Sequence, residues 1–309
     1  MATVSVWWIG WQAIGVGHSS FDIGNTYVTW LGDSGGGSSL FASSSRSSAS
    51  SEPSSSSASN VVNTLHAGTY TMLSDFGIFG AAAETHDIAE PGGAAAPFGL
   101  VDSARLRTWW QNFRQTTRHY RAVSTEYNCN AVVMMGLKMA GATLFCDPPT
   151  FDVYAGANKI RTFATDLNIR ITALNALYNR ADVAFPGPGD GAEPPTAAQW
   201  DLDPLRVEFG PDVRADLQQY EHANKSRDAL DALSRVLDRI LQRIAAGRSL
   251  APPPRAGQVA PLGILPGGAG AAVPIAHIRT FGRRVRDTMA RIQTFHTDHT
   301  SEKSIRNGM

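Results

Sequence analysis

The first thirty residues have the pattern of short β-strands. Residues 4–11 are rich in Val, Ile and Trp, and further strand-like segments follow at 17–23 and 26–31. The Gly24–Asn25 pair between the last two suits a tight turn between antiparallel strands. Apolar and polar residues alternate in the third segment, as in a strand with one buried face. These features predict an antiparallel sheet near the N-terminus.

Later in the chain, apolar residues recur at steps of three and four, which predicts amphipathic helices. Four segments have this spacing, at residues 102–113, 158–180, 212–246 and 275–295. Asp102 suits the N-cap of the first segment. Pro211 and Asp212 suit the start of the third, and Gly247 suits its end. The last segment carries five arginines, so it is either a basic membrane-surface helix or an ordinary solvated helix.

The composition changes sharply along the chain. Residues 34–59 consist mainly of serine and glycine. Such a segment cannot bury enough apolar surface to offset the entropy lost on ordering, so we expect a flexible insertion. Stretches rich in Pro and Gly at 185–196 and 251–274 have the composition of loops or linkers. We therefore predict four parts: an N-terminal domain at 1–150, a helical region at 151–250, a linker at 251–274 and a basic helix with its tail at 275–309.

Charge and cysteine content exclude several classes of protein. The 309 residues contain 27 Lys and Arg and 27 Asp and Glu, whereas nucleic-acid binders carry a basic surplus. Two cysteines are too few for a disulfide scaffold. No apolar run approaches the roughly 18 residues of a spanning helix, and we expect no signal peptide. His296 and His299 have the spacing of a metal pair but lack a nearby glutamate, so we expect no metal site there.

Cys129 is the first candidate for chemistry. It begins a segment that is apolar on nearly every face, which predicts a buried helix capped by Asn128 and ended by Gly141. Backbone N–H groups and the helix dipole at such a position favour a thiolate. The alternative is a small buried hydrophobic residue. Cys146 lacks this context, so we take it as structural and expect no disulfide between the two in a reducing cell.

Three motifs in order resemble circularly permuted papain-like thiol enzymes. The motifs are Gly17-His18-Ser-Ser-Phe-Asp-Ile with Tyr27-Val-Thr-Trp30, Phe98-Gly-Leu-Val-Asp102 with Trp109-Trp110, and Tyr127-Asn-Cys129-Asn-Ala-Val-Val133 with Leu137-Lys-Met-Ala-Gly-Ala142. The resemblance covers residues 4–146. It is strongest to the Rho-inactivation domain of multifunctional autoprocessing toxins and to IcsB-type effectors. Lecithin retinol acyltransferase and NlpC-type peptidases are more distant.

The resemblance implies an α+β fold in which an antiparallel sheet packs on a nucleophile-bearing core helix. The apolar periodicity of the later segments adds a C-terminal helical region. It implies Cys129 as the nucleophile and His18 as the general base and acid. An acid between them should orient the imidazole. We choose Asp75, in a strand-like setting, for this role, while Asp87, Asp22 and Glu84 remain open. We assign substrate binding to Tyr27, Trp30 and Asn128 and expect no metal.

The implied chemistry is acyl transfer through a Cys129 thioester. We expect a bacterial effector that acylates lysine amines of host proteins, with small GTPases as substrates, acyl-CoA as co-substrate and no resident cofactor. It would reach the host cell by a route without a signal peptide, or otherwise stay in the cytoplasm, and it could associate with a membrane surface. The alternatives are a cysteine peptidase, amidase or deamidase, which includes a toxin domain acting on cell-wall peptides, and a catalytically inactive binding protein.

Overall fold

The computed structural model describes ten segments of the chain, at residues 1–8, 17–30, 63–64, 75–76, 79–115, 119–120, 128–150, 156–186, 210–245 and 275–299. They form a mixed α+β structure with two compact units. Among described residues, the first unit comprises 1–90 and 99–169, and the second comprises 91–98 and 170–299. The serine tract at 34–59 and the linker at 251–274 lie outside the described residues. The domain boundaries at 150, 250 and 274 stay predictions.

A four-stranded antiparallel sheet forms the centre of the first unit. Its order is β3-β2-β1-β5, with β1 at Ala2–Trp8, β2 at Gly17–Ile23, β3 at Thr26–Val28 and β5 at Glu84–Ile88. The three strands expected from the first thirty residues are present, although β3 ends at Val28, earlier than expected. Gly24 turns between β2 and β3 with φ at +56°. β5 was not expected because its sequence, Glu-Thr-His-Asp-Ile, is largely polar. It pairs with β1 along the edge of the sheet.

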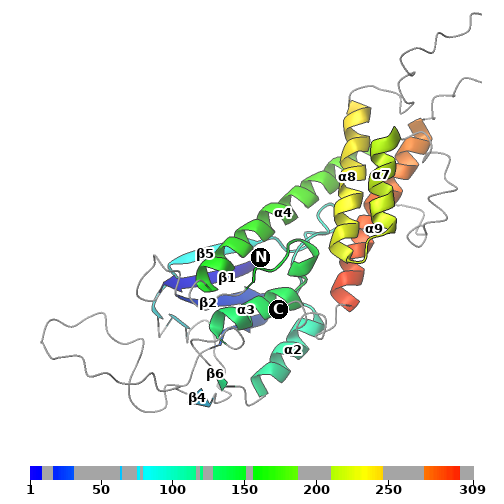
Figure 1. The fold of residues 1–309 in the computed structure, drawn as a ribbon. Coiled ribbons are helices and arrows are strands. Elements are labelled where there is room, and N and C mark those ends of the chain that lie inside the picture. The colour runs from blue at the N-terminus through cyan, green and yellow to red at the C-terminus, as the bar shows by residue number, and fades with distance from the viewer. Residues whose placement is uncertain are drawn as a thin grey trace, which may run out of the picture. The chain divides into compact units, whose positions relative to one another are not determined.

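The buried helix α3 (Cys129–Met139) packs against the sheet through β2 and β3 (Figure 1). Asn128 caps it as predicted, since its side-chain oxygen accepts from the Ala131 N–H at 2.7 Å. Gly141 follows with φ at +100°, the left-handed conformation that ends many helices. A Cβ at Gly136 would lie 3.3 Å from Val28 and 3.4 Å from Phe21, so the absence of a side chain lets helix and sheet approach closely.

Helix α2 (Ala104–Gln115) packs on α3 and buries the predicted face, formed by Leu106, Trp109, Trp110 and Phe113. The predicted cap is wrong by one residue. Ser103 accepts the Leu106 N–H at 3.2 Å. The Asp102 carboxylate instead accepts from the Asn25 N–H at 3.2 Å and the Thr26 hydroxyl at 2.9 Å, so it supports the β2–β3 turn.

Long helices follow the sheet in the chain. Helix α4 (Gly156–Ala184) contributes residues up to 169 to the first unit and the remainder to the second. A separate two-stranded ladder pairs β4 (Asn63–Thr64) with β6 (His119–Tyr120). The second unit also contains α7 (Gly210–Glu221), α8 (Ser226–Ala245) and α9 (Ile275–His299).

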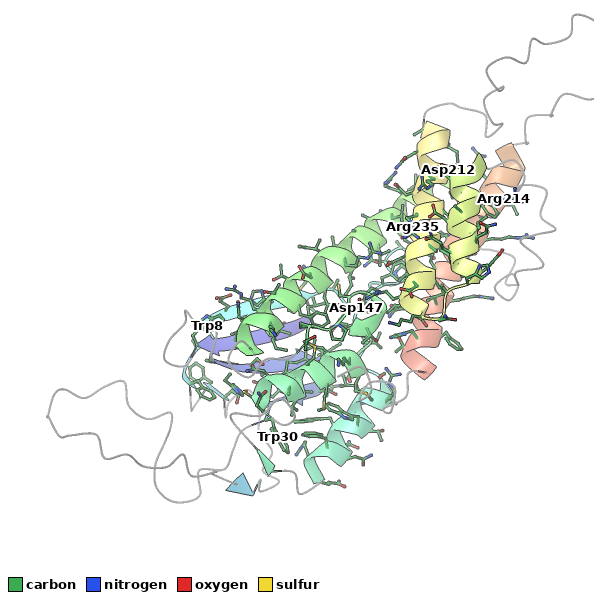
Figure 2. All side chains as sticks on the ribbon, in the orientation of Figure 1. Trp8, Trp30, Asp147, Asp212, Arg214 and Arg235 are labelled. Carbon is green, nitrogen blue, oxygen red and sulfur yellow. The ribbon has the colours of Figure 1, made fainter. Side chains whose placement is uncertain are left out.

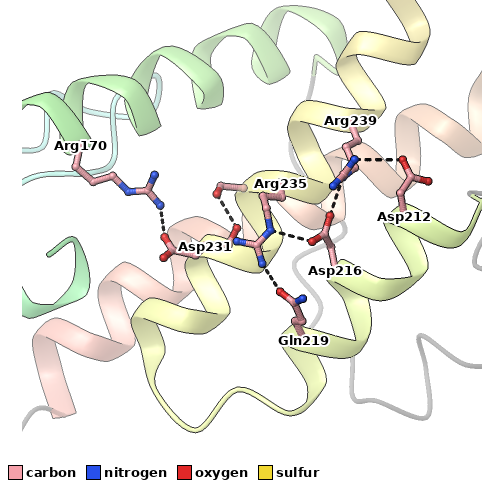
Figure 3. A network of polar contacts seen from close by, with 8 residues as sticks. Arg170, Asp212, Asp216, Gln219, Asp231, Arg235 and Arg239 are labelled. Atoms are coloured by element: carbon pink, nitrogen blue, oxygen red, sulfur yellow. Dashed lines mark hydrogen bonds and ion pairs between the residues drawn. The ribbon is translucent and has the colours of Figure 1, made fainter. Parts of the chain in front are cut away.

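The single helix predicted at 212–246 is wrong, because α7 and α8 form an antiparallel hairpin (Figure 3). The carboxylate of Asp216 accepts from Nε of Arg235 and from Nε of Arg239, each at 2.8 Å. Asp212 also pairs with Arg239, at 3.3 Å. The spacing of apolar residues continues through the turn because both helices bury one face. The periodicity alone therefore did not reveal that the helix is interrupted between α7 and α8.

Candidate active site

His18 lies near the start of β2, where it is buried among aromatic side chains. It is 1% exposed. Its ring stacks on Phe79 with centroids 4.7 Å apart and lies 5.3 Å from the ring of Trp7. Trp7 is its cross-strand partner in β1. The imidazole is therefore enclosed by apolar rings, which exclude water and strengthen the electrostatic contacts that it makes.

Two oxygens face one nitrogen of this ring. Oδ1 of Asp75 lies 3.3 Å from Nε2 of His18, and Oγ1 of Thr29 lies 3.1 Å from the same nitrogen. The hydroxyl of Tyr27 donates to the other carboxylate oxygen of Asp75 at 2.6 Å. Tyr27 and Thr29 are two residues apart along the chain, so an extended backbone places them on one face. The second ring nitrogen, Nδ1, is buried and has no nitrogen or oxygen partner within the described residues.

Asp75 is fully buried, but its backbone is not the strand-like setting that we predicted. Residues 75, 76 and 79 have helical backbone. Both Asp75 and Phe79 contact His18, the first through its carboxylate and the second through the ring that covers the imidazole.

The other acids that the sequence left open have different partners. Asp87 accepts from the hydroxyl of Thr3 at 3.0 Å. Glu84 accepts from Nε1 of Trp8 at 3.1 Å and lies 3.2 Å from Nε2 of His86. Asp22 lies near the far end of β2, four residues after His18. Asp75 is the acid of these four that the structure places against His18.

Cys129 occupies the first turn of α3 and is 6% exposed. Its Sγ lies 3.8 Å from the carbonyl oxygen of Gly17, the residue before His18. Neither cysteine forms a disulfide; Cys129 is buried and Cys146 is partly exposed. The thiol and the imidazole therefore come from the start of a helix and the start of a strand, which the fold brings together.

The electrostatics of His18 follow from these neighbours. Burial by itself would lower its pKa, because it disfavours the charged imidazolium. Hydrogen bonding to Asp75 and Cys129, and the negative charges of both groups, act in the opposite direction and raise the pKa of His18 from 6.5 to about 9. The raised pKa of His18 favours the imidazolium form that an imidazolium–thiolate pair requires. Burial and the hydrogen bond to Asp75 also raise the pKa of Tyr27, which keeps it a proton donor.

The residues predicted to bind substrate are all engaged within the protein. Tyr27 donates to Asp75, and Asn128 caps α3 and is 3% exposed. Trp30, labelled in Figure 2, is also 3% exposed and packs edge-on against Phe113 of α2 at 4.6 Å. Their roles in substrate binding stay predictions.

Three residues near His18 had no role predicted from the sequence: Thr29, Phe79 and Asn130. Thr29 and Phe79 contact the His18 ring directly. The alternation of Tyr27 and Thr29 was a usable signal, since it puts both hydroxyls on one strand face. Asn130 hydrogen-bonds to both neighbours of His18. Nothing in the local pattern pointed to it, because its partners lie on a distant strand.

The described residues also bear on metals and membranes. They contain no group of three or more His, Cys, Asp and Glu side chains arranged to hold a metal ion. Within the same residues, no helix combines the length and apolar character needed to cross a membrane. In the basic helix α9, Arg286 is 4% exposed and pairs with Asp182 at 2.6 Å. It is therefore removed from the exposed basic face.

Residues 47–185 match the family model of the IcsB middle domain. The match supports a relation to IcsB-type effectors. It spans somewhat less than half of the chain, and it contains Asp75 and Cys129, whereas His18 precedes it. No curated protein and no solved structure matches the chain. The IcsB-like segment includes β5, α2, α3 and α4. It supports the prediction of a bacterial effector, and the permuted papain-like topology stays a prediction.

Proposed function

We propose that this protein is a cysteine-dependent acyl-transfer enzyme in which Cys129 is the nucleophile, His18 the general base and acid, and Asp75 the group that orients His18. One observation carries the proposal. The carboxylate of Asp75, the imidazole of His18 and the thiol of Cys129 are all buried, and the imidazole interacts with both other groups. The thiol begins a helix, and the pKa of the imidazole is raised to about 9. A thiolate at a helix N-terminus beside an imidazolium is the activated form of a cysteine nucleophile.

In the proposed reaction, Cys129 is first acylated and the acyl group is then transferred to a lysine. The Cys129 thiolate attacks the carbonyl carbon of acyl-CoA, a carbon–sulfur bond forms, and the CoA thiolate leaves with the proton of His18. A lysine amine then attacks the thioester, His18 accepts the amine proton, and an amide forms as the Cys129 thiolate leaves. The backbone N–H of Cys129 would stabilise the oxyanion in both steps. The ion pair is restored at the end of the cycle.

We favour lysine acylation of a host protein because residues 47–185 match the IcsB middle domain. Under this proposal the protein is a bacterial effector that is delivered into the host cell, and membrane-bound small GTPases are its substrates. Exposed arginines of α9, such as Arg279, would favour contact with an anionic membrane surface. Water in place of the amine would give the alternative activity, that of a peptidase, amidase or deamidase.

An alkyne-bearing acyl-CoA with click detection tests the nucleophile. The wild-type chain should acquire a label that hydroxylamine removes, since hydroxylamine cleaves thioesters. Cys129→Ala should remain unlabelled, while the matched Cys146→Ala should label like wild type. Equal labelling of Cys129→Ala, or loss of labelling in Cys146→Ala, contradicts the assignment.

The fate of the label separates the candidate functions. Transfer to a lysine of an added small GTPase, resistant to hydroxylamine, supports the acyltransferase. Release as free fatty acid supports the hydrolase. A Cys146→Ala chain that folds but takes no label from either the acyl-CoA or a general thiol-reactive probe is the inactive binding protein.

A further inference from the structure

The side chain of Asn130 links the two halves of the candidate site. Its Oδ1 accepts from the hydroxyl of Ser19 at 2.7 Å, and its Nδ2 donates to the carbonyl oxygen of Gly17 at 3.0 Å. Gly17 and Ser19 are the two chain neighbours of His18, and Asn130 is the chain neighbour of Cys129. One amide therefore joins the residues that flank the base to the residue that follows the nucleophile.

These contacts are buried and closely packed. Asn130 is 5% exposed and Ser19 is fully buried. A Cβ at Gly156 would come within 2.8 Å of Nδ2 of Asn130, and a Cβ at Gly17 would come within 2.4 Å of the Trp7 carbonyl oxygen. The amide and its partners thus have little freedom to shift, since real Cβ contacts are almost never so short.

The carbonyl oxygen of Gly17 faces the first turn of α3. Nδ2 of Asn130 donates to it at 3.0 Å, and Sγ of Cys129 lies 3.8 Å away. The two bonds of the Asn130 amide therefore hold the backbone on either side of His18, and with it the point from which the imidazole leaves the strand.

We propose that Asn130 is a positioning residue that sets the alignment of the Cys129 thiol with the His18 imidazole. The inference rests on the proposed function, because it concerns the same ion pair. Asn130 does not touch the reacting atoms. It acts by tying β2 to the start of α3 at the two positions that flank His18.

The test uses the full chain with Cys146→Ala, in which Cys129 is the only thiol. The rate of alkylation of Cys129 by iodoacetamide is measured against pH, together with the rate of acyl transfer from acyl-CoA. Asn130→Ala should move the alkylation profile toward that of a free thiol, near pH 8.5. It should lower acyl transfer about a hundredfold, the effect of a misplacement of about 1 Å.

Asn175→Ala is the matched control. The Asn175 amide makes the same kind of paired contact, donating to the Phe98 carbonyl oxygen at 2.8 Å and accepting from the Phe98 N–H at 3.0 Å. It belongs to the second unit. Its loss should lower the melting temperature and leave the alkylation profile unchanged, which separates positioning from a general loss of stability.

Ser19→Ala is a second variant that tests the proposal if Asn130→Ala does not fold. It removes one of the two bonds of the amide and should shift the profile by a smaller amount in the same direction. An unshifted profile in a folded Asn130→Ala or Ser19→Ala chain, or an equal shift in Asn175→Ala, overturns the inference and leaves the proposed function intact. A parent chain whose thiol titrates near pH 8.5 and transfers no acyl group overturns both.

Discussion

The Asp75 carboxylate lies 3.3 Å from Nε2 of His18, and neither side chain is more than 1% exposed. A buried carboxylate beside a buried imidazole favours the imidazolium, because the low dielectric strengthens their attraction. The hydroxyls of Tyr27 and Thr29 complete the polar contacts around this pair. This arrangement favours a charged His18 despite its complete burial.

The pKa of His18 should depend on Cys129. In the wild-type chain, the His18 ring protons observed by NMR should titrate near pH 9, so the imidazolium persists through neutral pH. Cys129→Ala removes a hydrogen bond and a negative charge, both of which raise this pKa, while burial continues to lower it. The His18 pKa should therefore fall in Cys129→Ala and stay unchanged in Cys146→Ala. A wild-type value below 6.5 would mean that burial outweighs the two partners.

Substitution of His18 should affect the thiol in turn. His18→Ala removes the positive charge beside Cys129, so the iodoacetamide reactivity of Cys129 at pH 7 should fall and recover only as the pH approaches about 8.5. Acyl transfer should fall by several orders of magnitude, roughly a thousandfold or more. The control is His86→Ala, since His86 pairs with Glu84 on β5. If His86→Ala caused the same loss, His18 would not be the base.

Asp75 and Tyr27 should differ in their contributions to the rate. Asp75→Asn keeps the shape but removes the charge that favours the imidazolium, and the rate of acyl transfer should fall roughly a hundredfold to ten-thousandfold. Tyr27→Phe removes one hydrogen bond to the carboxylate and leaves its charge, so the loss should stay below about tenfold. Initial rates at pH 7 decide the order. A larger loss for Tyr27→Phe than for Asp75→Asn would point to a direct role for the tyrosine.

The α7–α8 hairpin should depend on Asp216. Its side chain is 6% exposed and accepts from two arginines, so Asp216→Ala leaves both without this partner and should cost about 2 kcal/mol. Asp238→Ala is the control, because Asp238 is 39% exposed and pairs with Arg180 at 3.4 Å. Exposed pairs contribute less than about 1 kcal/mol. Urea denaturation monitored by circular dichroism measures both changes, and equal costs would contradict the prediction.

The serine tract should be dispensable for folding. Residues 34–59 contain only Leu40 and Phe41 as large apolar side chains, too few to order such a segment. Replacing the tract with a short Gly/Ser linker should keep the melting temperature within a few degrees, since loop length changes the closure entropy only slightly. Thermal unfolding checks this. Loss of a cooperative transition in the deletion would show that the tract is part of the folded structure.

Much of the local structure could be predicted from the sequence. The β2–β3 turn, the buried helix after Asn128 and the apolar face of α2 depend on residues within a few positions of one another. The candidate nucleophile and base could also be predicted from the sequence, because Cys129 begins a buried helix and His18 belongs to a strand motif. Periodicity and capping are short-range properties, so one sequence is enough to read them.

The remaining decisions required the tertiary structure. Asp75 was the first choice among four acids as the partner of His18, but its spacing could not exclude the other three; only the folded chain places its carboxylate at Nε2. Asp102 had the chemistry of a cap, but the turn of β2 and β3 engages it and leaves the cap to Ser103. The role of Asn130 is likewise invisible locally, because its partners lie more than a hundred residues earlier in the chain. In each case several polar groups compete for the same partners, and contacts between distant segments decide which of them bind.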